Sequence, residues 1–274
     1  MTQFRAIDVS DMTPAVPASQ PAPQLLWVDI DKLVIDERYQ RPISARNRQA
    51  IRRIAAEFQW SRFSPVLIAP IPGGKYAVID GQHRAHAAAL CGFESIPAMI
   101  VLVAPEEQAL AFIEINTRQI RVGRELVYRA ALSAGEDWAI KCRDAVEAAG
   151  CRLMTSKYSN DKKKPGMVFA ISLIQRMVEN GKADAVTRAL KALLEYNRTS
   201  AANFSNDLLT PWIGAVAESA ADVDTLIAVL QTKRPWIVME AADQFAASDN
   251  KPKAQCRREM FALMIRRQIH GQSI

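Results

Sequence analysis

Hydrophobic and polar positions change their spacing about halfway along the chain. In the first half, short apolar runs bounded by Pro and Gly predict a strand and turn at 25–34 and further strands at 65–69, 76–79 and 96–103. Apolar positions at the spacing of one helix face predict a helix over 44–58, carried by Ile51, Ile54, Ala55 and Phe58. Small residues predict a helix over 82–90, and Pro105 opens another.

From Arg124 onward the pattern is helical almost throughout, and no strand is expected there. The expected helices are 124–133, 137–149, 166–180, 183–196, 206–220, 222–231, 234–247 and 254–269. We therefore predict an α/β N-terminal domain, a small mixed sheet with helices, followed by an all-α C-terminal domain. The predicted divisions are a flexible arm rich in Pro, Ala and Ser over 1–24, a sheet domain over 25–122 and a helical domain over 123–274.

Composition is typical of a soluble globular protein. The chain has 274 residues, of which 49% are hydrophobic and 23% charged. No apolar run approaches the length of a membrane span, and residues 1–23 lack the apolar segment of a secretory signal. The four cysteines show no CxxC spacing, which fits buried thiols in a reducing cytoplasm better than disulfides or zinc. We expect a cytoplasmic protein that does not enter a membrane.

Positive charge is clustered rather than spread. The net charge is +6, and residues 38–62 hold seven arginines and one glutamate. Residues 251–274 and a lysine-rich loop at 157–164 are also basic. Such clusters favour a phosphate-backbone partner such as DNA, and a solvated surface remains the alternative.

The stretch 78–87 joins a strand pattern, a glycine turn and a helix start. Its apolar run ends just before Gly81, and helix-forming residues follow. A strand that runs into a helix through glycine directs free backbone N–H groups above the turn, where they and the helix dipole favour phosphate. Arg84, His83 and His86 add side-chain donors at the same place. The pattern indicates a phosphate site.

This stretch resembles the ParB/sulfiredoxin superfamily. The residues Gly-Gln-His-Arg at 81–84 fit its Gly-x-His-Arg consensus. Tyr-Gln-Arg-Pro at 39–42 lies where ParB proteins carry a Gln-Pro-Arg box, and Glu-Ile-Asn-Thr-Arg-Gln at 114–119 lies where they carry a Glu-Asn-x-Gln-Arg box. Three boxes in the right order make the resemblance specific over about 25–122.

The resemblance implies a nucleoside triphosphate, ATP or CTP, bound with Mg²⁺. It also implies a protein that works with DNA, a homodimer, and a plasmid or phage context. The residues that we expect to hold the nucleotide are Arg41, Gly81, Gln82, His83, Arg84, His86, Asn116 and Arg118.

Several of these residues have alternative roles. Asp80 is the candidate catalytic residue, either accepting a proton or holding Mg²⁺ through water, and its alternative is a cap on the following helix. For Arg84 the alternative is a surface ion pair. His83 and His86 share a helix face, as metal ligands can, but the sequence offers no third ligand beside them.

Differences between this sequence and the family motifs exclude one of the family's activities. Sulfiredoxins carry the nucleophilic cysteine where this chain has Gln82, and an amide forms no thiolate, so that activity is excluded. Relative to ParB proteins, Gln82 and His83 replace Glu and Arg, and the spacing from Glu114 to Asn116 is one residue longer. The base preference of ParB proteins therefore does not transfer.

Helices that ParB proteins use to bind DNA are not evident in the second half. The best helix-turn-helix candidate is 171–194, but Met177 stands where the helix crossing needs a small residue, which favours an ordinary helical hairpin. The basic amphipathic helix 255–269 packs on the core, pairs with another subunit or contacts DNA.

Three hypotheses follow from the sequence. The first is a ParB-like nucleotide-binding protein that acts with DNA. The second is an enzyme on the same pocket, namely a small-molecule kinase, an NTPase or a nuclease, with Asp80 as base or metal ligand. The third is an interaction module that has lost the nucleotide.

Overall fold

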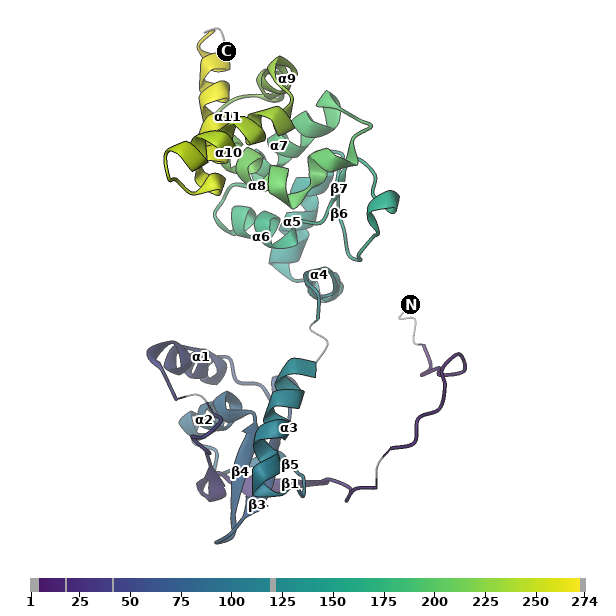
Figure 1. Ribbon diagram of the computed structural model, residues 1–274, viewed down its shortest axis with the longest axis vertical. Coiled ribbons are helices and arrows are strands. Elements are labelled where there is room, and N and C mark those ends of the chain that lie inside the picture. The colour runs from purple at the N-terminus through teal and green to yellow at the C-terminus, as the bar shows by residue number, and fades with distance from the viewer. Residues whose placement is uncertain (1–4, 18, 41, 119–121, 272–274) are drawn as a thin grey trace. The chain divides into compact units, whose positions relative to one another are not determined.

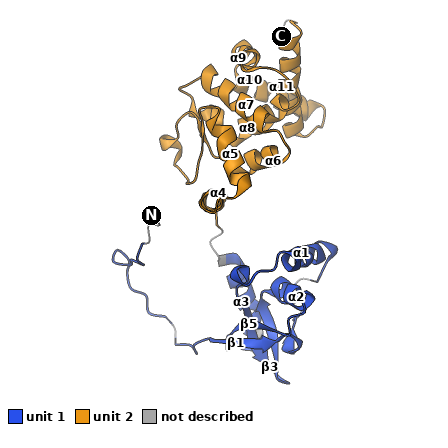
Figure 2. Ribbon diagram, turned by 180° about the vertical axis from the view of Figure 1, so that it is seen from behind, with its two compact units in different colours: residues 1–120 blue, residues 121–274 orange. Residues whose placement is uncertain are grey.

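The chain folds into two compact units, Met1–Ile120 and Arg121–Ile274 (Figure 1, Figure 2). The computed structural model describes residues 5–17, 19–40, 42–118 and 122–271. Among these residues, no helix combines the length and the apolar character needed to cross a membrane.

The N-terminal unit is built on a mixed five-stranded sheet with the order β1-β5-β3-β4-β2. The pairs β1–β5 and β3–β4 are antiparallel, whereas β3–β5 and β2–β4 are parallel. The strands are β1 (Gln24–Asp29), β2 (Leu33–Val34), β3 (Val66–Ile71), β4 (Lys75–Asp80) and β5 (Ser95–Ile100). A short 3₁₀ helix, η1 (Ile30–Lys32), joins the first two.

Successive residues of a strand point to opposite sides of the sheet, so each face carries apolar side chains. Helices cover both faces. On one face, Val66, Val78 and other strand side chains form a core with Ala85 and Ala88 of α2 (Gln82–Leu90). On the other face, Leu67, Ala69 and Ile79 pack with residues of α3 (Pro105–Arg118), as Figure 1 shows for the helix. The helix α1 (Ala45–Ala56) packs on α2, and η2 (Trp60–Arg62) follows it.

The C-terminal unit is a helical bundle around Trp212. The Trp212 indole N–H donates to the carbonyl of Ala189 at 3.0 Å, and its ring lies 5.4 Å from that of Phe261. The helices are α4 (Arg124–Ser133), α5 (Asp137–Glu147), α6 (Ile171–Glu179), α7 (Ala183–Tyr196), α8 (Asn206–Val216), α9 (Val223–Thr232), α10 (Pro235–Ser248) and α11 (Lys253–Ile269). In α11, Phe261, Met264 and Ile265 are buried, so this basic helix packs on the core.

The fold class expected from the sequence is confirmed, with one local correction. The helix expected over 166–180 begins only at Ile171, because Met167–Val168 (β7) pairs in parallel with Arg152–Leu153 (β6). Two short 3₁₀ helices, η3 (Asn160–Lys162) and η4 (Ala201–Phe204), complete this unit. The small β6–β7 ladder is the exception to a unit expected to contain no strand.

Candidate functional site

The turn between β4 and α2 requires glycine for two reasons. Gly81 is the N-cap of α2 and has φ 99°, in the region that favours glycine. A Cβ placed there would lie 2.8 Å from Cγ1 of Val66 and 2.9 Å from Nη2 of Arg84. Backbone conformation and lack of space therefore both exclude a side chain at this position.

The first turn of α2 carries uncompensated N–H donors. The N–H of Ala85 is the first to donate within the helix, to the carbonyl of Gly81 at 3.0 Å. The N–H groups of Gln82, His83 and Arg84 precede it, no side chain caps this end, and its first turn holds no acidic residue. The positive end of the helix dipole is thus available to an anion.

Arg84 is held beside the turn by Asp80. Its Nη2 lies 3.2 Å from Oδ2 of Asp80 and 3.4 Å from the carbonyl of Pro65, and both charged side chains are part-buried. Its Nε is buried and has no hydrogen-bond partner among the described residues. The guanidinium is therefore positioned but not saturated by protein acceptors.

This geometry corrects the alternative role considered for Asp80. A helix cap would accept an N–H from the first turn of α2, and no side chain does so. Asp80 instead forms the ion pair with Arg84 that was the alternative for that arginine. A phosphate at this turn would compete with the Asp80 carboxylate for Arg84, unless a cation bridged the two anions.

The two histidines lie in the same first turns of α2 and differ in their contacts. His86 Nδ1 lies 2.8 Å from the carbonyl of Gln82. Because a carbonyl only accepts, Nδ1 carries the proton, which leaves Nε2 of the neutral ring as an acceptor. Among the described residues, no group of three His, Cys, Asp or Glu side chains is placed to hold a metal ion.

Gln40 anchors the upstream box against the turn. The residue is 7% exposed, and its Nε2 donates to the carbonyls of Val78 at 3.0 Å and Ile79 at 2.9 Å. The sequence placed this residue in a motif without giving it a role, so its anchoring contact was missed. Arg41, which follows it, lies outside the described residues.

Tyr39 connects the same box to α3. Its ring lies 5.6 Å from that of Phe112, and its buried hydroxyl has no hydrogen-bond partner within the described chain. Burial, followed by the negative charge of Asp36, raises the Tyr39 pKa above its ordinary value. The upstream box thus contacts both β4 and α3.

The downstream box lies on α3 and is only partly described. The Asn116 side chain is exposed, and its Nδ2 donates to the carbonyl of Phe112 at 2.8 Å, within its own helix. The Arg118 side chain lies outside the described residues. The structure therefore joins the upstream box to the turn, whereas a ligand contact by Asn116 stays a prediction.

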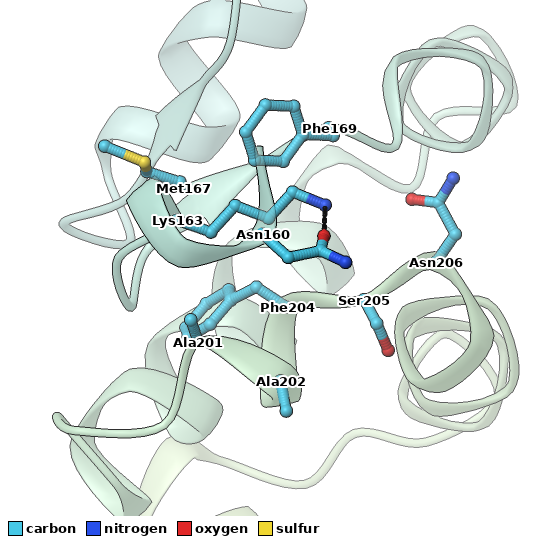
Figure 3. Close-up of a pocket in the computed structure, with 9 residues that line it drawn as sticks. All are labelled: Asn160, Lys163, Met167, Phe169, Ala201, Ala202, Phe204, Ser205 and Asn206. Atoms are coloured by element: carbon cyan, nitrogen blue, oxygen red, sulfur yellow. Dashed lines mark hydrogen bonds between the residues drawn. The ribbon is translucent and has the colours of Figure 1, made fainter. Parts of the chain in front are cut away.

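Two of the cavities among the described residues lie in different units of the chain. A cavity of about 170 Å³ adjoins Arg84 and is lined also by Ile54, Glu57, Phe58, Gln59, Arg62 and Phe63. A larger one of about 500 Å³ lies in the C-terminal unit, where Lys163 donates to the carboxamide of Asn160 near Phe169 (Figure 3). Of the residues expected from the sequence to bind a ligand, those that the structure describes do not line this larger cavity.

Residues 23–116 match the family model of the ParB N-terminal domain. An ATP-dependent L-serine kinase from Staphylothermus marinus is 32% identical over 87 residues, which is 31% of this chain and 32% of the kinase. The chain thus spans about a third of the length of the curated relative it matches.

Solved structures with some similarity are also ParB proteins. The C-terminally truncated ParB from Caulobacter crescentus complexed with CTP-gamma-S is 15% identical, with 74% of this chain and 97% of that chain covered and a TM-score of 0.37. The same protein complexed to the centromeric parS site is 13% identical, with 88% and 99% covered and a TM-score of 0.30.

The family match coincides with the sheet, the glycine turn and the boxes described above. It begins near β1 and ends within α3, so that it includes the turn at Gly81 and the anchoring Gln40. Residues 23–116 therefore form a ParB N-terminal domain, within the ParB/sulfiredoxin superfamily.

Proposed function

We propose that the N-terminal unit binds a nucleoside triphosphate through its phosphates at the β4–α2 turn. The observation that carries this proposal is the uncapped start of α2 at Gly81, where a side chain would strike Val66. The backbone N–H groups of Gln82 and His83 and the guanidinium of Arg84 supply the donors. His86, one turn further along α2, would add a donor only as the imidazolium, because Nε2 of the neutral ring is an acceptor.

The nucleotide is ATP or CTP with Mg²⁺. ATP is favoured by the identity to an ATP-dependent kinase over a segment of similar length to the domain, and CTP by the resemblance to ParB proteins. Magnesium fits the charges at the turn, because Asp80 is a carboxylate beside the phosphate donors and would repel an unaccompanied triphosphate. Asp80 would hold the ion directly or through water.

Calorimetric titration with ATP, CTP, GTP and UTP in the presence of Mg²⁺ tests this function. The intact chain should bind one of the four, and Arg84→Ala should weaken binding by about 10-fold or more, the effect of a charged hydrogen bond of about 1.5–3 kcal/mol. Arg143→Ala, which removes an exposed arginine paired with Asp144, should change nothing. Failure of the intact chain to bind any nucleotide would contradict the proposal.

A second candidate function is phosphoryl transfer from the bound nucleotide. It is favoured by the identity to a kinase and by the carboxylate of Asp80 at the turn. Under this function Asp80→Asn should abolish turnover and spare the fold, since the amide retains the shape of the carboxylate. An unchanged rate of nucleotide hydrolysis or transfer would remove Asp80 from the mechanism.

We also propose that the basic surface of α1 contacts DNA phosphates. The arginines of this surface are exposed, and no ion pair joins them to a carboxylate among the described residues; they are Arg46, Arg48, Arg52 and Arg53. Binding should be strongest at low salt and fall as salt rises. No binding of DNA at low salt, with and without nucleotide, would contradict this contact. Sedimentation with and without nucleotide tests the expected homodimer.

A further inference from the structure

Five aromatic rings gather at one end of α1 and form a surface that we call the aromatic cluster. It consists of Trp27, Phe58, Trp60, Phe63 and Phe93. Trp60 lies at its centre, with ring centroids 4.8–5.4 Å from the other four. Such distances are typical of packed aromatic pairs, so the rings support one another as a rigid group.

The base of this cluster is buried and its indoles are not. The three phenylalanines are half-buried and pack on the core that includes Val28 and Val66. Trp27 is 63% exposed and Trp60 is 43% exposed. Trp27 lies on β1, one of the two edge strands of the sheet, where strand pairing covers one side only. Two indoles that neighbouring rings hold in place are thus exposed to solvent. Burying this apolar surface would stabilise the unit, so its exposure indicates a binding role.

Unpaired positive charge adjoins these indoles. Arg62 lies on the same 3₁₀ helix as Trp60 and lines the 170 Å³ cavity with Phe58 and Phe63. The α1 arginines precede Phe58 in the chain, and Arg62 shares with them the lack of any ion pair to a described carboxylate. Three carboxylates neighbour the cluster in sequence, namely Asp29, Glu57 and Glu94, and Asp29 is already paired with Lys32 at 2.7 Å. Cations therefore predominate beside the exposed rings.

We infer that the aromatic cluster and the arginines of α1 and η2 bind single-stranded nucleic acid. Bases stack on the Trp60 and Trp27 rings, and the arginines contact the phosphates between them. The inference rests on the proposed contact of the basic surface with DNA and adds the form of nucleic acid that is recognised. In a duplex, neighbouring base pairs cover the faces of each base. The phosphates of a duplex can therefore contact the arginines, but its bases cannot stack on the indoles.

Fluorescence polarisation with a labelled oligothymidylate of about 16 nucleotides and a duplex of equal length tests this inference. Trp60→Ala should weaken single-strand binding by about 10-fold or more, because stacking contributes about 1–3 kcal/mol per base. Trp60→Phe keeps a stacking ring and should keep most of the affinity. Trp236→Ala, which removes a 41% exposed indole of the C-terminal unit, is the matched control and should have no effect.

The arginines have a separate signature in the salt dependence. The double variant Arg52→Ala, Arg53→Ala should reduce the slope of log affinity against log salt by about 0.7 for each phosphate of a single strand that the protein no longer neutralises. Circular dichroism of each variant establishes that it is folded before its binding is measured.

The outcomes separate the inference from the function on which it rests. Equal binding of both DNA forms, unchanged in Trp60→Ala, overturns the stacking inference and leaves the phosphate contact intact. No binding of either form overturns both. A dimer in sedimentation that Trp60→Ala dissociates, together with unaltered single-strand affinity, would show that a second copy covers the cluster and would also overturn the inference.

Discussion

Replacing Gly81 by alanine tests the central turn most severely. At φ 99° an L-residue is strained by about 1–2 kcal/mol. The new Cβ would also stand 2.8 Å from Cγ1 of Val66, which is fully buried and cannot withdraw. Overpacking of this kind costs about 1–3 kcal/mol. Gly81→Ala should therefore destabilise the N-terminal unit by about 2–5 kcal/mol, a large part of the stability of an ordinary domain.

Gly92→Ala is the matched control at the other end of α2. Gly92 also has a positive φ, 83°, but a Cβ there meets no atom within 4 Å. Gly92→Ala should therefore lower the stability of the unit only by the backbone strain of about 1–2 kcal/mol. The difference between the two variants isolates the contact with Val66, and adding Val66→Ala to Gly81→Ala should recover part of it in a double-mutant cycle.

Native-state amide exchange of α2 and β3 measures these effects within the N-terminal unit, without interference from the unfolding of the other unit. The amides of α2 and β3 should exchange much faster in Gly81→Ala than in Gly92→Ala. Equal exchange in the two variants would refute the argument that space as well as φ demands glycine at the turn.

Other predictions follow from single contacts. Gln40→Leu should destabilise the N-terminal unit by about 1–3 kcal/mol, because two buried carbonyls of β4 lose their donor, and amide exchange of β4 will report it. A thiol reagent at pH 8 should label exposed Cys91 well before the other cysteines of the native chain, since burial raises the pKa of Cys142 to about 11; labelling of Cys142 at the same rate would contradict its burial. Hydrogen bonds from Arg38 lower the pKa of Asp36, so this pair stabilises the fold above the ordinary carboxyl pKa, and its contribution disappears as pH falls through the lowered value. Arg38→Ala should therefore move acid unfolding to higher pH, and an unchanged midpoint would show that the pair adds nothing.

Local signals in the sequence predicted the elements around the site well. A strand pattern, the Asp-Gly pair and a run of alanines placed the turn at Gly81 and the helix at 82–90, because all of these act within a few residues. The same is true of α7, whose apolar face gave its bounds of 183–196. Such features depend on neighbours in the chain and are therefore visible in it.

Contacts between distant residues could not be predicted in this way. Nothing near Gln40 shows that its carboxamide bonds carbonyls 38 and 39 residues away. The pairing of Met167–Val168 with Arg152–Leu153, which shortened an expected helix, has the same origin. The aromatic cluster joins Trp27 on β1 to Trp60 on η2 and to Phe93 before β5, three segments that only the sheet brings together. Topology, rather than pattern, decides these contacts.

The most direct test of the nucleotide site is the backbone amide NMR spectrum of the chain during titration with Mg²⁺-ATP and Mg²⁺-CTP. We predict that one of the two nucleotides shifts the amide signals of Gly81, Gln82, His83 and Arg84 most, since their N–H groups would bind its phosphates. Unchanged signals at this turn with either nucleotide, or changes confined to the cavity beside Lys163, would contradict it.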